Sequence, residues 1–199
     1  MKTLSYCVIL CACLISACQK AAIPPDQNVD AKITVQKSLT EYIIRKGNHY
    51  SDQTEYQLIS TNAIRAKVKF DNSAIYTSKD AVNQGDVNKL VGFSDCGTNH
   101  HQNSARLGWS WNGKDVMLYA YAYVDSVRII KTLGAVNLNE SFSCSVSTKG
   151  SYYYFTMNNY SDSIPAHCVG YTGSRYKLFP YFGGDEIAPH DIRIALTEE

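Results

Sequence analysis

The sequence lacks an excess of charge of either sign. Its 199 residues include 19 lysines and arginines and 18 aspartates and glutamates, so the formal net charge is only +1. Basic residues do not gather into a stripe that could follow a phosphate backbone. The composition therefore argues against a nucleic-acid-binding protein, and equally against a domain held on anionic lipid by charge alone.

The sequence also lacks a hydrophobic run long enough to cross a bilayer, which takes roughly 20 residues. The apolar stretch Leu4–Ala17 is shorter than that, and Lys2 precedes it as a short basic region. Such an amino-terminal segment is typical of an export signal.

The end of this segment, Ile15–Cys18, resembles a bacterial lipobox, in which an aliphatic residue and two small residues precede the cysteine that is acylated. The resemblance implies a lipoprotein with a signal peptide over residues 1–17, a lipidated tether over residues 18–38 that begins at Cys18, and a single domain over residues 39–199. An ordinary cleaved signal with an incidental cysteine is the alternative. A palmitate chain together with diacylglycerol exceeds the two-signal threshold for stable membrane anchoring.

We therefore expect a protein of the bacterial cell envelope that is lipid-anchored, in the outer membrane, through Cys18. The face of the membrane stays open. Lipoproteins displayed on the surface of Bacteroidetes often carry acidic residues directly behind the lipidated cysteine, and Gln19–Ala22 has none.

Cysteine is scarce once the leader is removed. Cys7, Cys11 and Cys13 leave with the signal peptide and Cys18 is lipidated, so three thiols remain: Cys96, Cys144 and Cys168. Three thiols in an oxidising compartment allow one disulfide at most. The sequence does not fix the pair, although Cys144–Cys168 closes the shorter loop and is our preference.

Helical periodicity is nearly absent, and most periodic segments alternate with a period of two. In Asn62–Phe70, isoleucine, alanine, valine and phenylalanine alternate with basic residues, as in a half-buried antiparallel strand. Ala105–Trp111 and Asp115–Val127 flank Asn112-Gly113, a strong hairpin signal. The one short helix signal lies in residues 79–90, where Asp86 could cap a single turn. We predict an all-β fold, an antiparallel β-sandwich of jelly-roll or concanavalin-like topology with very little helix.

Four segments carry a resemblance to a known family: Gly92–Gly97, His100–Arg106, Gly108–Trp111 and Tyr176–Asp191. Together they resemble a family of small secreted proteins and lipoproteins from Bacteroidetes, over about residues 40–197. The resemblance implies a compact β-sandwich and an envelope address. That family has no assigned activity, so it supplies no catalytic residues.

The second strand of the hairpin has two distinct rows. Val116, Leu118, Ala120, Ala122 and Val124 must face the core, while Tyr119, Tyr121 and Tyr123 face either a second layer or an open groove. Aromatic rings stack on the apolar faces of sugars, so this row, together with Trp109 and Trp111, is the candidate ligand-binding surface for a glycan. The alternative is that the tyrosines simply pack under loops.

A second candidate site lies just before the hairpin, at His100, His101 and Arg106. In a polysaccharide lyase, Arg106 would neutralise a uronate carboxylate while a histidine or Tyr121 moved a proton. A transition metal on Cys96 and the two histidines is disfavoured, because adjacent histidines rarely point at one ion. The preferred interpretation is a polar loop ordered by its own hydrogen bonds, with Arg106 binding backbone carbonyls.

Several kinds of catalytic site are missing. No strand carries the pair of carboxylates that glycoside hydrolysis needs, and no G-x-S-x-G, P-loop or H-E-x-x-H motif occurs. Asp185, Glu186 and Asp191 could offer oxygen ligands to Ca²⁺, but a solvated turn is the preferred interpretation; no other cofactor is expected.

The sequence favours non-catalytic binding of a glycan or another envelope ligand, with a polysaccharide lyase and a structural or interaction protein as alternatives. One geometric observation separates them. A covered tyrosine row favours the structural protein and an open groove favours binding, whereas convergence of Arg106 and a histidine on that groove favours the lyase.

Overall fold

The computed structural model describes residues 39–199. The expected signal peptide (1–17), the lipidation site Cys18 and the tether up to residue 38 lie outside these residues and stay predictions. The described chain forms twelve strands and two short 3₁₀ turns. In order they are β1 (Thr40–Ile44), β2 (Leu58–Ile59), β3 (Ala63–Phe70), η1 (Asn72–Ala74), η2 (Ala81–Gly85), β4 (Asn88–Ser94), β5 (Ser104–Trp111), β6 (Val116–Val124), β7 (Val127–Val136), β8 (Ser141–Lys149), β9 (Tyr152–Met157), β10 (Tyr160–Pro165), β11 (Arg175–Leu178) and β12 (Ile192–Glu198).

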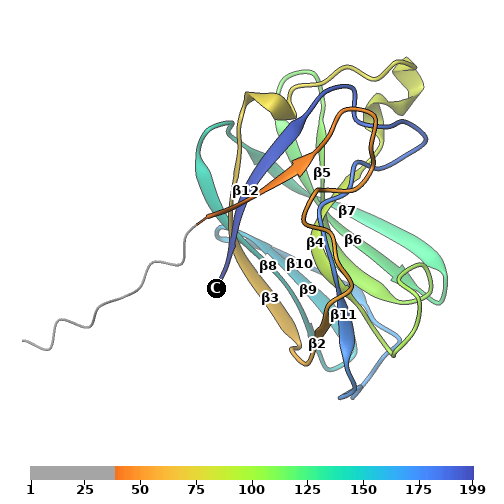
Figure 1. Ribbon diagram of the computed structural model, residues 1–199. Coiled ribbons are helices and arrows are strands. Elements are labelled where there is room, and N and C mark those ends of the chain that lie inside the picture. Colours follow the sequence, from red (N-terminus) through yellow and green to blue (C-terminus); the bar gives the residue numbers. More distant parts are fainter. Residues whose placement is uncertain (1–38) are drawn as a thin grey trace, which may run out of the picture. The chain divides into compact units, whose positions relative to one another are not determined.

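The strands form two six-stranded sheets, ordered β1-β12-β3-β8-β9-β10 and β2-β11-β4-β5-β6-β7 (Figure 1). Neighbouring strands pair antiparallel in both sheets. This confirms the predicted antiparallel β-sandwich with very little helix. Among residues 39–199 the structure has no helix with the length and apolarity that a bilayer span requires.

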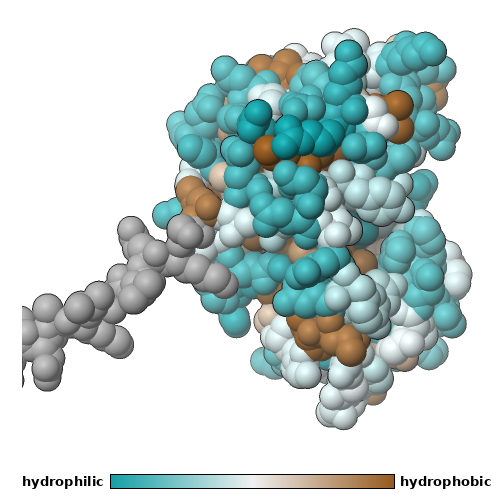
Figure 2. Space-filling model, in the orientation of Figure 1, coloured by the Kyte–Doolittle hydropathy of each residue, from teal (hydrophilic) through white to brown (hydrophobic). Residues whose placement is uncertain are grey.

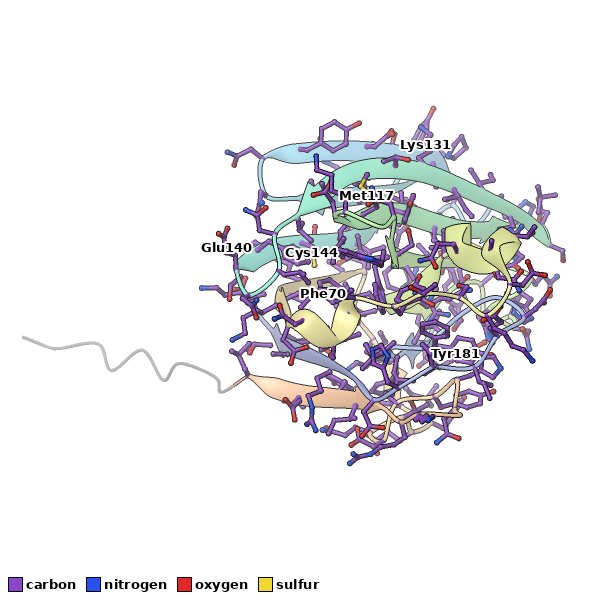
Figure 3. The ribbon with its side chains drawn as sticks, turned by 90° about the horizontal axis from the view of Figure 1, so that it is seen from above. Phe70, Met117, Lys131, Glu140, Cys144 and Tyr181 are labelled. Atoms are coloured by element: carbon purple, nitrogen blue, oxygen red, sulfur yellow. A yellow bond between two sulfur atoms is a disulfide. The ribbon has the colours of Figure 1, made fainter. Side chains whose placement is uncertain are left out.

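The core lies between the two sheets and is built by the period-two rows. On β3, Ile64, Ala66, Val68 and Phe70 are buried, and the intervening residues face outward. Figure 3 shows Phe70 and Cys144 between the layers. Burying one large apolar side chain contributes roughly 1.5–3 kcal/mol, so these rows set which face of each strand points inward. The face of the domain seen in Figure 2 is mostly hydrophilic, with hydrophobic residues in separate groups.

The short helical turn lies before Asp86, over Ala81–Gly85, so its capping residue is six positions earlier than predicted. Asp80, not Asp86, caps it, because the Asp80 carboxylate accepts a hydrogen bond from the Val82 N–H, while Asp86 follows the last residue. The Asn112-Gly113 hairpin does form, between β5 and β6. Its Asn112 side chain accepts hydrogen bonds from the N–H groups of Lys114 and Asp115, and Gly113 has a φ of 94°.

The disulfide joins Cys96 to Cys168, so the preference for Cys144–Cys168 was wrong. Cys144 lies on the inward row of β8, between Phe142 and Val146, and is buried in the core. The bonded pair is separated by 72 residues. In the chain-entropy model a loop of that length stabilises the fold by about 4 kcal/mol.

Candidate functional site

A groove of about 640 Å³ opens on the outer face of the β2-β11-β4-β5-β6-β7 sheet. The sheet supplies its floor, and the β1–β2 and β4–β5 loops and the segment after β11 supply its walls. Its lining is rich in tyrosines and cations: Tyr50, Thr54, Glu55, Tyr56, Lys89, His100, His101, Arg106, Tyr121, Tyr123, Arg128, Tyr176, Lys177, Phe179, Pro180, Tyr181 and Gly184.

Strand β6 contributes two of the three predicted tyrosines. Its aliphatic row is fully buried in the core from Val116 to Ala122, which directs the tyrosine row to the outer face as predicted. Tyr121 and Tyr123 line the groove, with ring centroids 5.9 Å apart. Tyr119 does not reach it, and its hydroxyl instead lies 3.0 Å from Ser110 Oγ.

The two tryptophans are not groove residues, which corrects the predicted ligand-binding set. Trp109 is completely buried between the sheets and packs against Phe70, with ring centroids 5.0 Å apart. Trp111 is partly buried against the same core. Trp109 lies in the inward row of β5 with Ala105 and Leu107, so its side chain points into the core and not into the groove.

Arg106 occupies the floor, on the outward row of β5. Across from it in the register lies Gly92, next to a β-bulge in β4. A Cβ atom at Gly92 would come within 2.3 Å of Arg106 Cβ, so only glycine allows this approach of the two strands. The bulge in β4 and the absence of a side chain at Gly92 together allow Arg106 to lie in the floor of the groove.

Arg106 is a buried cation that forms no ion pair among the described residues. Its side chain is buried, Nη2 donates a hydrogen bond to the carbonyl of Phe179 (2.9 Å), and Nε has no hydrogen-bond partner. Burial lowers the pKa of the guanidinium to about 10, against the opposing effect of nearby tyrosines, first Tyr121. A desolvated charge without a counter-ion is costly to hold. Its position in an open groove suits an anion that is not part of the protein.

Lys89 adds a second charge beside Arg106. Its Nζ lies 5.1 Å from the ring centroid of Tyr121 and 5.9 Å from that of Tyr181, so two aromatic faces hold the ammonium. Desolvation, followed by repulsion from Arg106 and Arg128, lowers the pKa of Lys89 to about 8.

His100 and Tyr176 form a hydrogen-bonded pair on one wall. The Tyr176 hydroxyl lies 3.0 Å from Nδ1 of His100 and accepts a hydrogen bond from the His100 backbone N–H at 2.6 Å. Desolvation, the neighbouring His101 and then Arg106 lower the pKa of His100 to about 4, so its imidazole is neutral at pH 7. Burial raises the pKa of the Tyr176 phenol, although His100 and Arg106 oppose the effect.

The structure thus brings together Arg106, His100, His101, Tyr121 and Tyr123, all of which the sequence singled out. It adds residues that sequence reasoning missed, chiefly Lys89, Tyr176 and Tyr181. Figure 3 labels Tyr181 on the segment after β11, which forms a bridge with Tyr50 of the β1–β2 loop. For Tyr176 and Tyr181, the sequence offered one signal, the density of aromatic residues in Tyr176–Tyr181.

The three carboxylates considered for Ca²⁺ do not come together. Glu186 accepts hydrogen bonds from the N–H groups of Lys79 and Asp80, whereas Asp191 bonds to Arg45 and Lys46. Within residues 39–199, no three histidine, cysteine, aspartate or glutamate side chains form a group that could hold a metal ion. Cys96, the third residue of the metal site that we disfavoured, is in the disulfide.

No family model and no curated protein matches the sequence. Solved structures do match the fold. Alginate lyase AlyC3 has a TM-score of 0.56 and 11% identity, over 81% of this chain and 74% of that one. The polysaccharide lyase family 18 structure aly-SJ02 r-CATD has a TM-score of 0.50 and 13% identity, over 83% and 90%. The GH16 protein of the Bacteroides ovatus mixed linkage glucan PUL, in complex with its G4G4G3G product, has a TM-score of 0.50 and 13% identity, over 82% of each chain. At these identities the likeness shows the fold, a jelly-roll type of β-sandwich.

Proposed function

We propose that the protein is a polysaccharide lyase that binds a uronate-containing glycan in the groove and cleaves it by β-elimination. The observation that carries the proposal is Arg106, a buried guanidinium in the floor of an open groove that has no counter-ion within residues 39–199. A uronate carboxylate supplies the missing anion and matches the planar fork of the guanidinium. The groove lining also favours an anion, because it has four cationic side chains, of which Lys177 is paired with Glu198, and one carboxylate, Glu55.

The reaction needs a proton to move from C5 of the uronate to the leaving oxygen. Arg106 holds the carboxylate and stabilises the negative charge that spreads onto it when the C5 proton leaves. The Tyr176–His100 pair takes that proton, the electron pair forms the C4–C5 double bond, and the C4–O bond breaks. The leaving oxygen receives a proton from the same pair, so atoms and charge balance.

Substrate binding improves the proton-accepting group. Part of the lowering of the His100 pKa comes from the positive charge of Arg106. A carboxylate paired with Arg106 would cancel part of that charge and raise the pKa of His100 toward the working pH, where a general base is most effective.

Structural neighbours are consistent with glycan chemistry. The alginate lyase AlyC3 has also been solved with dimannuronate, a uronate disaccharide, at a TM-score of 0.56 and 10% identity to this chain. At that identity the neighbour shows the fold and suggests a class of substrate to test. The roles proposed for Arg106, His100 and Tyr176 are inferred from the geometry of this groove.

The direct test is to incubate the protein with a panel of uronate polymers and follow the ultraviolet absorbance of the new C4–C5 double bond. We expect Tyr176→Phe to lower kcat about 100-fold or more, because proton transfer typically contributes factors of that order. Tyr119→Phe is the matched control and should keep wild-type activity, because Tyr119 does not line the groove. The absence of new absorbance from every uronate polymer would sink the elimination reaction.

The activity should depend on pH in a predictable way. The profile of kcat/KM should rise as pH passes about 4, where His100 becomes neutral, and fall as pH passes about 8, where Lys89 loses its charge. Lys89→Met should raise KM and remove the alkaline limb, whereas Lys114→Met in the exposed hairpin turn should change neither. An alkaline limb that persists in Lys89→Met would contradict the assignment.

Non-catalytic glycan binding in the same groove is the second candidate. It is favoured by the aromatic residues at the groove edge, since Tyr56 is 77% exposed and Tyr50 is 63% exposed. Retention of uronate polymers by the wild-type protein, without any new absorbance, would support this candidate in place of the lyase.

A further inference from the structure

The outer face of the other sheet carries a second ordered pattern of polar side chains, over β3, β8, β9 and β10. We call it the hydroxyl face. Its centre is a row of serines on β8, namely Ser141, Ser143, Ser145 and Ser147, which alternate with buried residues. Ser145 Oγ lies 2.7 Å from Thr156 Oγ1 of β9, so the row continues onto the next strand.

Cations border the serine row on one side. Arg65 and Lys67 of β3 lie directly opposite Ser145 and Ser143 in the register. Lys69 completes the outward row of this strand. Other exposed cations of the domain, such as Arg193 and Arg45, are paired with carboxylates. Within residues 39–199, the three cations of β3 take part in no ion pair, although the backbone N–H of Glu199 bonds to the Arg65 carbonyl.

Two exposed tyrosines border the row on the other side. Tyr152 and Tyr154 of β9 are 41% and 38% exposed, and their ring centroids are 6.2 Å apart. Tyr154 lies opposite Ser147, and Tyr152 lies opposite Lys149. Between β3 and β9 there are two strand spacings, roughly 10 Å, a distance that a short run of sugar units covers.

We propose that the hydroxyl face is a second binding surface for an acidic polysaccharide, separate from the groove. Tyrosine rings offer stacking platforms for sugar faces, the serine and threonine hydroxyls match sugar hydroxyls, and the unpaired cations attract carboxylates. The groove lies on the outer face of the opposite sheet, so the two surfaces bind different segments or different chains. A polymer held on the hydroxyl face stays at the protein while the groove releases its products.

The chemistry favours a glycan over a membrane surface. A protein surface that lies in a bilayer interface buries a broad apolar face, whereas this face is lined with hydroxyls between its cations and tyrosines. The acidic character of the ligand rests on the function proposed for the groove. The experiment therefore tests binding to the hydroxyl face separately from cleavage in the groove.

The test is native gel electrophoresis of the full chain in gels that contain alginate or polygalacturonate. Arg106→Met is used as the background, because it silences the groove and leaves the polymer intact. We expect the gel to retard this variant, and we expect Tyr152→Ser with Tyr154→Ser to weaken the binding about tenfold. Lys67→Ser with Lys69→Ser should also weaken it. Tyr160→Ser should not, because Tyr160 is an exposed tyrosine of β10 that shares its row with the buried Ile164 and so points away from the hydroxyl face.

The outcomes distinguish the two proposals. Turnover of a short oligouronate, which only the groove processes, should be unchanged by the variants of the hydroxyl face. Loss of retardation in these variants supports the hydroxyl face even if no uronate polymer is ever cleaved. No retardation of the Arg106→Met background would overturn it. So would equal retardation by a neutral β-glucan, or binding to anionic phospholipid vesicles without binding to either polymer.

Discussion

Arg106→Met should lower kcat/KM on a uronate polymer by about 100- to 1000-fold, because it removes the buried guanidinium in the groove floor that holds the carboxylate. The same change should cost the fold little. In the part of the chain that the structure describes, this desolvated guanidinium has no counter-ion. Its replacement by an apolar side chain therefore removes a desolvation penalty and loses one hydrogen bond, worth about 1 kcal/mol. We therefore expect activity to collapse while the free energy of unfolding, measured in urea, changes by no more than about 1 kcal/mol.

Two further variants sharpen this result. Arg106→Lys keeps the charge and loses the two-pronged geometry, so it should retain intermediate activity. Arg193→Met removes an exposed arginine whose partner is Glu41, and should leave activity unchanged. If Arg106→Met kept wild-type activity, or if it unfolded the domain, the guanidinium would be a structural group and the lyase proposal would lose its main support.

The fold could be predicted because its signal is local. Strands β3, β8 and β12 show their buried face through alternation, as Ile64, Val68 and Phe70 do on β3, and this pattern indicates an antiparallel sandwich. The same alternation explains why two predictions were wrong, that of Trp109 as a ligand-binding residue and that of Cys144 as a disulfide partner. Trp109 has the same parity as Leu107, and Cys144 has the same parity as Phe142 and Val146, so both belong to the core.

The site could be predicted only in part because it is assembled by pairing between distant strands. Arg106 and Tyr121 face each other across the β5–β6 hairpin, so the pairing of two strands that are consecutive in the sequence brings them together. Lys89 and Tyr176 enter through β4 and β11, and the β4–β11 pairing joins segments more than eighty residues apart. Alternation predicts to which face of its strand a side chain points, but it does not predict which other strand pairs with that strand.

Arg175→Met should destabilise the domain by about 3–5 kcal/mol, the cost of leaving one member of a buried ion pair alone. Asp95 and Arg175 are 0% and 3% exposed, and both Nε and Nη2 of the arginine lie 2.9 Å from Asp95 Oδ1. For a domain of this size the loss corresponds to a fall in Tm of roughly 6–20 °C. Arg45→Met, which breaks an exposed pair, should lower Tm by far less.

This ion pair also holds the two halves of the proposed proton-transfer pair. Asp95 begins the loop that carries His100, and its carboxylate accepts a hydrogen bond from Cys96 N–H at the start of that loop. Arg175 directly precedes Tyr176. We therefore expect Arg175→Met to reduce kcat at temperatures where the protein is still folded, because the distance between His100 and Tyr176 is no longer fixed. Asp95→Asn combined with Arg175→Met should cost less stability than the sum of the single changes, since neither charge is then left alone. Additive losses in a double-mutant cycle, or a Tm within about 2 °C of wild type for Arg175→Met, would contradict this role.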